Sequence, residues 1–138
     1  MNILEKYQLT GTFTFKVGER LASKCVDIPN EPGVYLIYAV KKNKKKLVYI
    51  GASGKMNQDG SFKVQKLKKR IQNMQNSSTR RQTYFENKIK ELNMDSIEVK
   101  WFVTYLNEHS DLPLNIEGTL LQMHFDKFRV LPLWNNQA

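Results

Sequence analysis

The stretch Gly33-Val-Tyr-Leu-Ile-Tyr-Ala-Val40 is the most strongly patterned part of the 138-residue chain. Apolar, β-branched and aromatic side chains fill it, which is typical of a central strand. The lysine-rich tract Lys41–Lys46 follows and predicts a hairpin loop, and Leu47-Val-Tyr-Ile50 then predicts a second strand that ends at Gly51. Two strands joined by a short loop predict an antiparallel pair at the centre of the fold.

Further strands and helices are predicted around this hairpin. Period-two alternation predicts a strand over Thr10–Val17, and Ile97–Tyr105 predicts a third core strand. Apolar residues at helical spacing predict three helices, over Lys63–Gln75, Arg80–Leu92 and Leu114–Phe128. The expected fold is a small α/β domain whose central, mostly antiparallel three-stranded sheet is flanked by helices, with an N-terminal strand extension.

The helical periodicity also predicts which side chains face the core. The first helix is expected to bury Val64, Leu67, Ile71 and Met74. For the two later helices the expected buried residues are Phe85, Ile89, Leu92, Ile116, Leu120, Leu121, Phe125 and Phe128. Pro113 is expected in the first turn of the last helix, where its missing N–H costs nothing.

Length and composition indicate one globular domain. We expect residues 30–138 to form the core and residues 1–29 to pack on it as an extension. No apolar run approaches the roughly 20 residues of a membrane helix, and the first residues lack the apolar stretch of a secretion signal. Cys25 is the only cysteine, which excludes an internal disulfide and a thiolate zinc site. These features favour a cytoplasmic location.

The positive charge is concentrated in one segment. Between Lys41 and Arg81 the chain has thirteen basic residues and one acid, Asp59, which is a local charge of +12 within a net charge of +9. Charge placed in one segment creates a directional field, and a polyanion is its natural partner because phosphate neutralisation releases counterions. A solvated lysine-rich surface is the alternative interpretation.

Five short motifs occur in a fixed order along the chain. Gly33-Val-Tyr35 and Val48-Tyr-Ile-Gly51 are followed by Leu67-Lys-Lys-Arg70, Ile116-Glu-Gly-Thr-Leu-Leu121 and Leu131-Pro-Leu-Trp-Asn135. Together they resemble the catalytic domain of the GIY-YIG nuclease superfamily, which includes the excision-repair incision nuclease. The resemblance covers residues 33–135, about three quarters of the chain.

The resemblance implies a metal-dependent DNA endonuclease that leaves 5′-phosphate and 3′-hydroxyl ends. The implied catalytic residues are Tyr35, Tyr49, Arg70, Glu117 and Asn135. Glu117 would anchor Mg²⁺ (or Mn²⁺), since one carboxylate suffices when waters and the substrate phosphate complete the octahedron. Arg70 offers a planar fork that matches phosphate oxygens. Asn135 would either orient a phosphate or tie the C-terminal tail to the site.

One tyrosine is expected to act as general base and the other to position water or phosphate, and we favour Tyr49 as the base. A phenol pKa near 10 is too high for this role, but positive charge from the metal, Arg70 or Lys55 would lower it. In an antiparallel pair, the numbers of two directly opposed residues add up to a constant sum. The two tyrosine side chains lie on one face of the sheet only if this sum is even, as in a register that places Val40 opposite Lys46. An odd sum would instead place Tyr38 beside Tyr49.

The DNA backbone is expected to contact basic residues of the charged segment. These are Lys44, Lys45, Lys46, Lys55, Lys63, Lys66, Lys69, Arg80 and Arg81. Specificity could come from a protein partner or a homo-oligomer, because no separate binding domain is evident. The chain departs from the family pattern at Met74, where many members carry a proton-transferring histidine or tyrosine.

Two other functions also fit parts of the sequence. The chain could be a nucleic-acid-binding module that keeps the GIY-YIG fold with weak or absent cleavage, and Met74 favours this. It could also be a basic scaffold that binds protein or RNA, which would explain the charge but not the ordered motifs.

Overall fold

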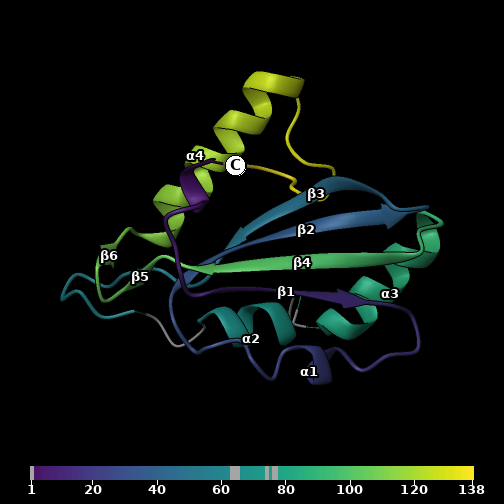
Figure 1. The fold of residues 1–138 in the computed structure, drawn as a ribbon, viewed down its shortest axis with the longest axis horizontal. Helices are drawn as coiled ribbons and strands as arrows, with labels where there is room; N and C mark the ends of the chain where they lie inside the picture. The colour runs from purple at the N-terminus through teal and green to yellow at the C-terminus, as the bar shows by residue number, and fades with distance from the viewer. Residues whose placement is uncertain (1, 63–65, 74, 76–77) are drawn as a thin grey trace.

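The sheet has four strands, and every adjacent pair is antiparallel (Figure 1). The computed structural model describes residues 2–62, 66–73, 75 and 78–138. The strands are β1 (Thr10–Phe15), β2 (Gly33–Lys41), β3 (Lys44–Ala52) and β4 (Ser96–Val103), in the order β1-β4-β2-β3. The sheet has four strands rather than three because the predicted N-terminal strand pairs with β4 and becomes an edge of the same sheet.

Helices cover both faces of this sheet. The helices are α1 (Leu21–Lys24), α2 (Leu67–Gln72), α3 (Arg81–Glu91) and α4 (Pro113–Phe128). In Figure 1, α4 lies on one side of the sheet, and α1, α2 and α3 lie on the other. The short elements η1 (Asn2–Leu4), β5 (Tyr105–Leu106) and β6 (His109–Ser110) complete the fold. None of the helices within the described ranges is long and apolar enough to cross a membrane.

Each face of the sheet has its own hydrophobic core. On the face of α1, α2 and α3, Phe15, Tyr35 and Ile37 pack with helix residues such as Leu67 and Phe85. On the α4 face, the core consists of Leu4, Tyr7, Val34, Leu36, Ile50, Ala52, Ile116, Leu120 and Leu121. Successive residues of β2 therefore belong to the two cores in turn, because successive side chains of a strand point to opposite faces of the sheet.

The lysine-rich tract was predicted to be a loop, and this was wrong for most of it. Only Lys42 and Asn43 form the turn, with φ values of 49° and 66°, which is the conformation of a two-residue type I′ hairpin. Lys44 to Lys46 belong to β3. An edge strand accommodates them because lysine side chains remain in solvent and discourage pairing with another chain.

The helix boundaries and buried faces are confirmed in part. Among the described residues, α2 begins at Leu67 and buries Leu67 and Ile71; predicted helix residues Val64 and Met74 lie outside the described residues. Leu92, Phe125 and Phe128 were expected in the core but are exposed by 41%, 39% and 55%. Leu92 lies just after α3 ends. The C-terminal end of α4 projects away from the sheet in Figure 1, and neither hydrophobic core includes Phe125 or Phe128.

Candidate active site

The register of β2 and β3 places Tyr35 and Tyr49 on the same face. Tyr35 is opposite Gly51 and Ile37 is opposite Tyr49, so opposed numbers have an even sum, as predicted. The predicted pairing of Val40 with Lys46 was wrong, because the register shifts after Ile37 and Val40 pairs with Lys45. The shift is a β-bulge that skips Val48. Opposed numbers have an odd sum between the turn and the bulge and an even sum beyond it, so the bulge is what places Tyr35 and Tyr49 on one face.

The two tyrosine rings lie side by side at different depths. Their centroids are 5.8 Å apart and the ring planes are inclined by 36°, which is within the usual range for interacting aromatic pairs. Tyr35 is fully buried, whereas Tyr49 is half-buried. Tyr49 is therefore the phenol that solvent or a ligand can reach.

The glycines of the two strand motifs permit this packing. A Cβ on Gly51 would lie 2.5 Å from Cζ of Tyr35 and 2.7 Å from Cε2 of Tyr49. A Cβ on Gly33 would lie 2.0 Å from the backbone oxygen of Phe102 on β4. Both positions exclude any side chain, so Gly51 makes room for the tyrosine pair and Gly33 for the neighbouring strand.

Arg81 is buried against both tyrosines, so its predicted contact with DNA at the surface was wrong. Its side chain is 3% exposed, and its Nη2 donates a hydrogen bond of 2.8 Å to the Tyr35 hydroxyl. Its guanidinium carbon lies 5.7 Å from each tyrosine ring centroid and 5.3 Å from that of Phe85. Arg81, Phe85 and Ile89 are four residues apart on α3 and share its buried face, so the helical spacing already contained this signal.

The charges of this cluster influence one another. Burial opposes the charge of Arg81, but the phenols of Tyr35 and Tyr49 outweigh it, and the pKa of the guanidinium is raised. The pKa of Tyr49 is also raised, chiefly because an ionised Tyr35 would place a like charge beside it and because it is buried. Arg81 and Arg70 lower the pKa of Tyr49, as expected of nearby cations, but they do not reverse the shift.

The charge of Arg70 acts on both Tyr49 and Glu117. Glu117 is half-buried on the first turns of α4, and burial raises the pKa of its carboxyl while the charge of Arg70 lowers it. Arg70 is exposed on α2, and its charge acts on Tyr49 as well. Residues from β3, α2 and α4 are therefore close enough to interact electrostatically, although these elements are far apart in sequence.

Backbone contacts explain how helices on opposite faces reach one place. The first residue of α2, Leu67, donates its N–H to the oxygen of Glu31, just before β2. Thr104 donates to the oxygen of Pro32, and Asp111, two residues before α4, donates to the oxygen of Thr104. Both helices thus begin at the end of the sheet where β2 starts, and side chains from their first turns can meet beyond that end.

Asn135 binds the edge strand. Its Oδ1 accepts a hydrogen bond from Ile50 N–H at 3.0 Å, and its Nδ2 donates to the oxygen of Ile50 at 2.9 Å. The N–H of Trp134 also donates to the oxygen of Val48. Of the two roles predicted for Asn135, this geometry favours attachment of the C-terminal tail, which covers the free edge of β3 beside Tyr49.

The predicted DNA-binding residues divide by environment. Lys44, Lys46, Lys55, Lys69 and Arg80 are exposed, and Lys66 is half-buried at the start of α2. Lys45 forms an ion pair of 2.8 Å with the mostly buried carboxylate of Glu98, so its charge is already engaged. Lys63 lies outside the described residues.

A divalent metal would have few protein ligands here. No three His, Cys, Asp or Glu side chains of the described ranges are grouped as a metal cluster. Glu117 alone is suited to hold Mg²⁺, because Mg²⁺ keeps several waters and accepts one or two carboxylates together with substrate phosphates. The half-buried Glu117 carboxylate fits this arrangement, since a bound cation would favour its charged form.

Comparisons with protein-family models, curated proteins and solved structures found no match for this chain. Assignment of a function therefore depends on the residues of the site.

Proposed function

We propose that this protein is a metal-dependent endonuclease of the GIY-YIG type that hydrolyses DNA phosphodiester bonds. The observation that best supports the proposal is the grouping of Tyr35, Tyr49 and Arg81 beside an exposed Arg70 whose charge acts on both Tyr49 and Glu117. Purely structural packing does not require a buried guanidinium that is hydrogen bonded to a buried phenol and in contact with a second one.

The two tyrosines have different roles in this proposal. Tyr49 is half-buried and is the phenol that contacts the attacking water. Tyr35 is fully buried and accepts a hydrogen bond from Arg81, so it positions Tyr49 and does not touch the substrate. Tyr35 and burial raise the pKa of Tyr49, and Arg81 and Arg70 offset only part of this rise, so the further lowering that a general base requires would have to come from a bound cation.

Arg70 and Glu117 act on the phosphate and the cation. Arg70 is exposed and can donate two N–H groups to the scissile phosphate. Glu117 holds the metal through one carboxylate. The bound metal would supply a water of lowered pKa and neutralise charge on the phosphoryl oxygens.

The decisive experiment is nicking of supercoiled plasmid DNA in Mg²⁺, Mn²⁺ or EDTA. We expect cutting that requires the metal, and a loss of at least about a hundredfold in Glu117→Gln, because the metal loses its protein ligand. Glu108→Gln is the matched control, since this glutamate is exposed in the turn between β5 and β6.

Three outcomes would contradict the proposal. Metal-independent cutting, or equal cutting by both glutamine variants, would exclude Glu117 as the metal ligand. If the wild type binds DNA but cuts none of the plasmids or branched substrates tested with either metal, the chain is instead a nucleic-acid-binding module.

A further inference from the structure

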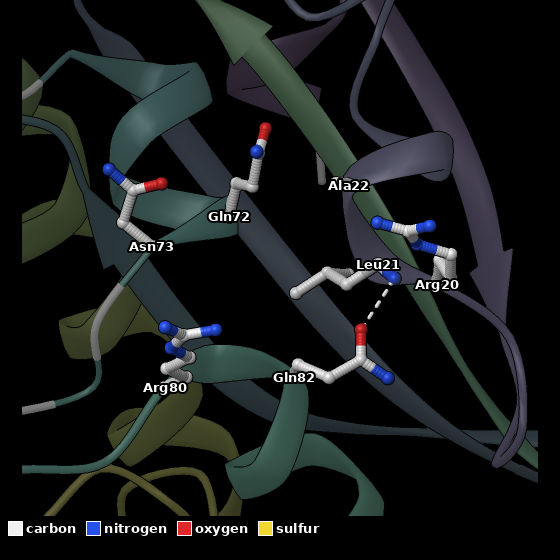
Figure 2. Close-up of a pocket in the computed structure, with 7 residues that line it drawn as sticks. All are labelled: Arg20, Leu21, Ala22, Gln72, Asn73, Arg80 and Gln82. Carbon is white, nitrogen blue, oxygen red and sulfur yellow. Dashed lines mark hydrogen bonds between the residues drawn. The ribbon is translucent and has the colours of Figure 1, made fainter.

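A second polar site lies where α1, α2 and α3 meet. The pocket has a volume of about 470 Å³. As Figure 2 shows, it is lined by Arg20, Leu21, Ala22, Gln72, Asn73, Arg80 and Gln82. The lining comes from the N-terminal extension and from the ends of two core helices. It does not include the tyrosine pair or Glu117, so it is distinct from the proposed catalytic cluster.

The pocket has two cations and no anion. The lining residues include two arginines and no carboxylate. Among the residues that the structure describes, neither Arg20 nor Arg80 forms an ion pair. The one hydrogen bond drawn between lining residues in Figure 2 joins Leu21 N–H to Gln82 Oε1, so the guanidinium groups are not bonded to other lining side chains. Two exposed guanidinium groups beside side-chain amides favour an oxyanion ligand.

Gln82 joins two of the segments that line the pocket. Its Oε1 accepts from Leu21 N–H at 2.6 Å, and its Nε2 donates to the oxygen of Glu19 at 2.8 Å. These two bonds attach the start of α1 to the first turn of α3, so the backbone segments that carry Arg20 and Arg80 lie on opposite sides of the same pocket.

The pocket is joined to the catalytic cluster through two helices. Arg80 immediately precedes the buried Arg81, and the N–H of Arg81 donates to the oxygen of Asn73 at 2.7 Å. Asn73 lies one helical turn after Arg70, which is about 4.5 Å along the axis of α2. A nucleic-acid strand whose scissile phosphate contacts Arg70 can therefore pass the pocket.

We propose that this pocket binds one nucleotide of the substrate DNA strand, next to the scissile position, with its phosphate held by Arg20 and Arg80. The inference rests on the proposed nuclease function. The volume is typical of small-molecule pockets, about 300–1,000 Å³, and exceeds that of a phosphate group alone. The amides of Gln72 and Asn73 line the remaining space, and such amides hydrogen bond with base edges.

The test measures binding in EDTA, so that metal-dependent cutting does not interfere. The affinity of a fluorescent DNA duplex and of a single strand is measured over a range of salt concentrations for the wild type and Arg20→Gln/Arg80→Gln. Lys90→Gln/Lys127→Gln removes the same charge from exposed positions on α3 and α4 outside the pocket. We expect the pocket variant to bind about tenfold more weakly, with a salt slope reduced by about one, and the control to change much less.

A second arm separates a DNA strand from a free nucleotide. Deoxyadenosine monophosphate and inorganic phosphate are titrated into the labelled protein, and NMR shifts of the amide groups of Gln72, Asn73 and Gln82 are followed. If the pocket variant loses these shifts but keeps wild-type affinity for both DNAs, the ligand is a free nucleotide and the strand assignment is overturned. Equal DNA affinity in both variants with no NMR shift in the wild type would overturn the site itself.

The results also separate this inference from the proposed function. If the wild type cuts plasmid DNA and the pocket variant binds and cuts normally, the nuclease proposal stands and the pocket assignment fails. If the wild type cuts nothing but the pocket variant loses DNA affinity relative to its control, the pocket assignment stands and the nuclease proposal fails. The melting temperature of each variant identifies any loss of folding.

Discussion

The two faces of the sheet are built on different chemistry. On the α4 face, aliphatic side chains such as Ile50, Ile116 and Leu120 form most of the contact with the helix. On the opposite face, the same strands present Tyr35 and Tyr49, and a buried guanidinium lies between these rings and Phe85. The aliphatic face holds α4 in place, whereas the aromatic face contains groups that donate and accept hydrogen bonds.

Burial of Arg81 shows why this difference matters. Removing a guanidinium from water is costly unless hydrogen bonds or opposite charge compensate. Here the compensation is the Tyr35 hydroxyl and the faces of three rings, and no carboxylate of the described residues forms an ion pair with Arg81. Cation–π contacts of this kind offset only part of the desolvation. The buried guanidinium therefore makes the aromatic face less stable than it would be with aliphatic packing like that between the sheet and α4.

The largest effect should come from a methyl group added on the aromatic face. Gly51→Ala would place a Cβ 2.5 Å from Tyr35 and 2.7 Å from Tyr49, so the rings must move apart. We expect a loss of about 3 kcal/mol in the free energy of unfolding, the upper part of the usual range for overpacking. Chemical denaturation measures this loss, and plasmid nicking should fall with it.

Gly118→Ala is the matched control on α4. A Cβ at Gly118 meets no atom within 4 Å, and alanine favours a helix by about 0.5–1 kcal/mol over glycine. We therefore expect this variant to be slightly more stable than the wild type. Equal stability changes in the two alanine variants would show that the tight packing at Gly51 is not real.

Replacing Arg81 and Arg70, one at a time, by methionine should separate effects on folding stability from effects on nicking activity. Arg81→Met leaves the buried Tyr35 hydroxyl without its donor, which we expect to cost about 1–3 kcal/mol. Arg70→Met removes an exposed side chain, and we expect a change within about 0.5 kcal/mol. Both variants should lose nicking activity. Equal stability in both, measured by urea unfolding, would contradict a structural role for Arg81.

The shared face of the two tyrosines was predicted, but alternation and a short connection do not by themselves produce it. The two-residue turn pairs Lys41 with Lys44, which is an odd sum, and the bulge restores the even sum that places Tyr35 and Tyr49 on one face. The bulge after Ile37 escaped prediction, because a single extra residue leaves the alternation of each strand almost unchanged. The pattern also could not show where the sheet ends, so Phe125 and Phe128 were wrongly assigned to the core.

The charged residues were harder to predict because their environment depends on distant contacts. Arg81 was counted with the exposed cations, although Tyr35, its hydrogen-bond acceptor, is 46 residues away in sequence. The helical spacing of Arg81, Phe85 and Ile89 indicates that Arg81 lies on the buried face of its helix. Arg81 was considered only as one of the basic residues of the charged segment, so this indication was missed. Asn135 binds the backbone of Ile50, 85 residues away, and sequence alone did not choose between its two roles.

A smaller effect is expected where the tail covers the edge of the sheet. Asn135→Ala removes two hydrogen bonds to Ile50, and we expect a loss of about 1–2 kcal/mol. Asn136→Ala is the control, because Asn136 is exposed, and it should change stability by less than about 0.5 kcal/mol. Hydrogen exchange of the Ile50 amide should become faster in the first variant alone. Unchanged protection of that amide would mean that the tail does not cover β3.

The last effect is absent at neutral pH and appears only in alkali, where Cys25 and Tyr49 of the aromatic face should lower the stability. Burial raises the pKa of Cys25 from 9.0 to about 12, and the pKa of Tyr49 is raised above 10.0. A raised folded-state pKa means that the unfolded chain loses its proton first. Stability from these groups is therefore complete below pH 9 and falls as the pH rises, by at most about 1.4 kcal/mol per pH unit for each group.

Cys25→Ala should flatten the fall in stability that begins at pH 9, and Tyr49→Phe should flatten the part that begins near pH 10. Urea unfolding between pH 7 and 11 measures both, and identical pH profiles for the wild type and the two variants would show that neither group titrates abnormally in the folded protein.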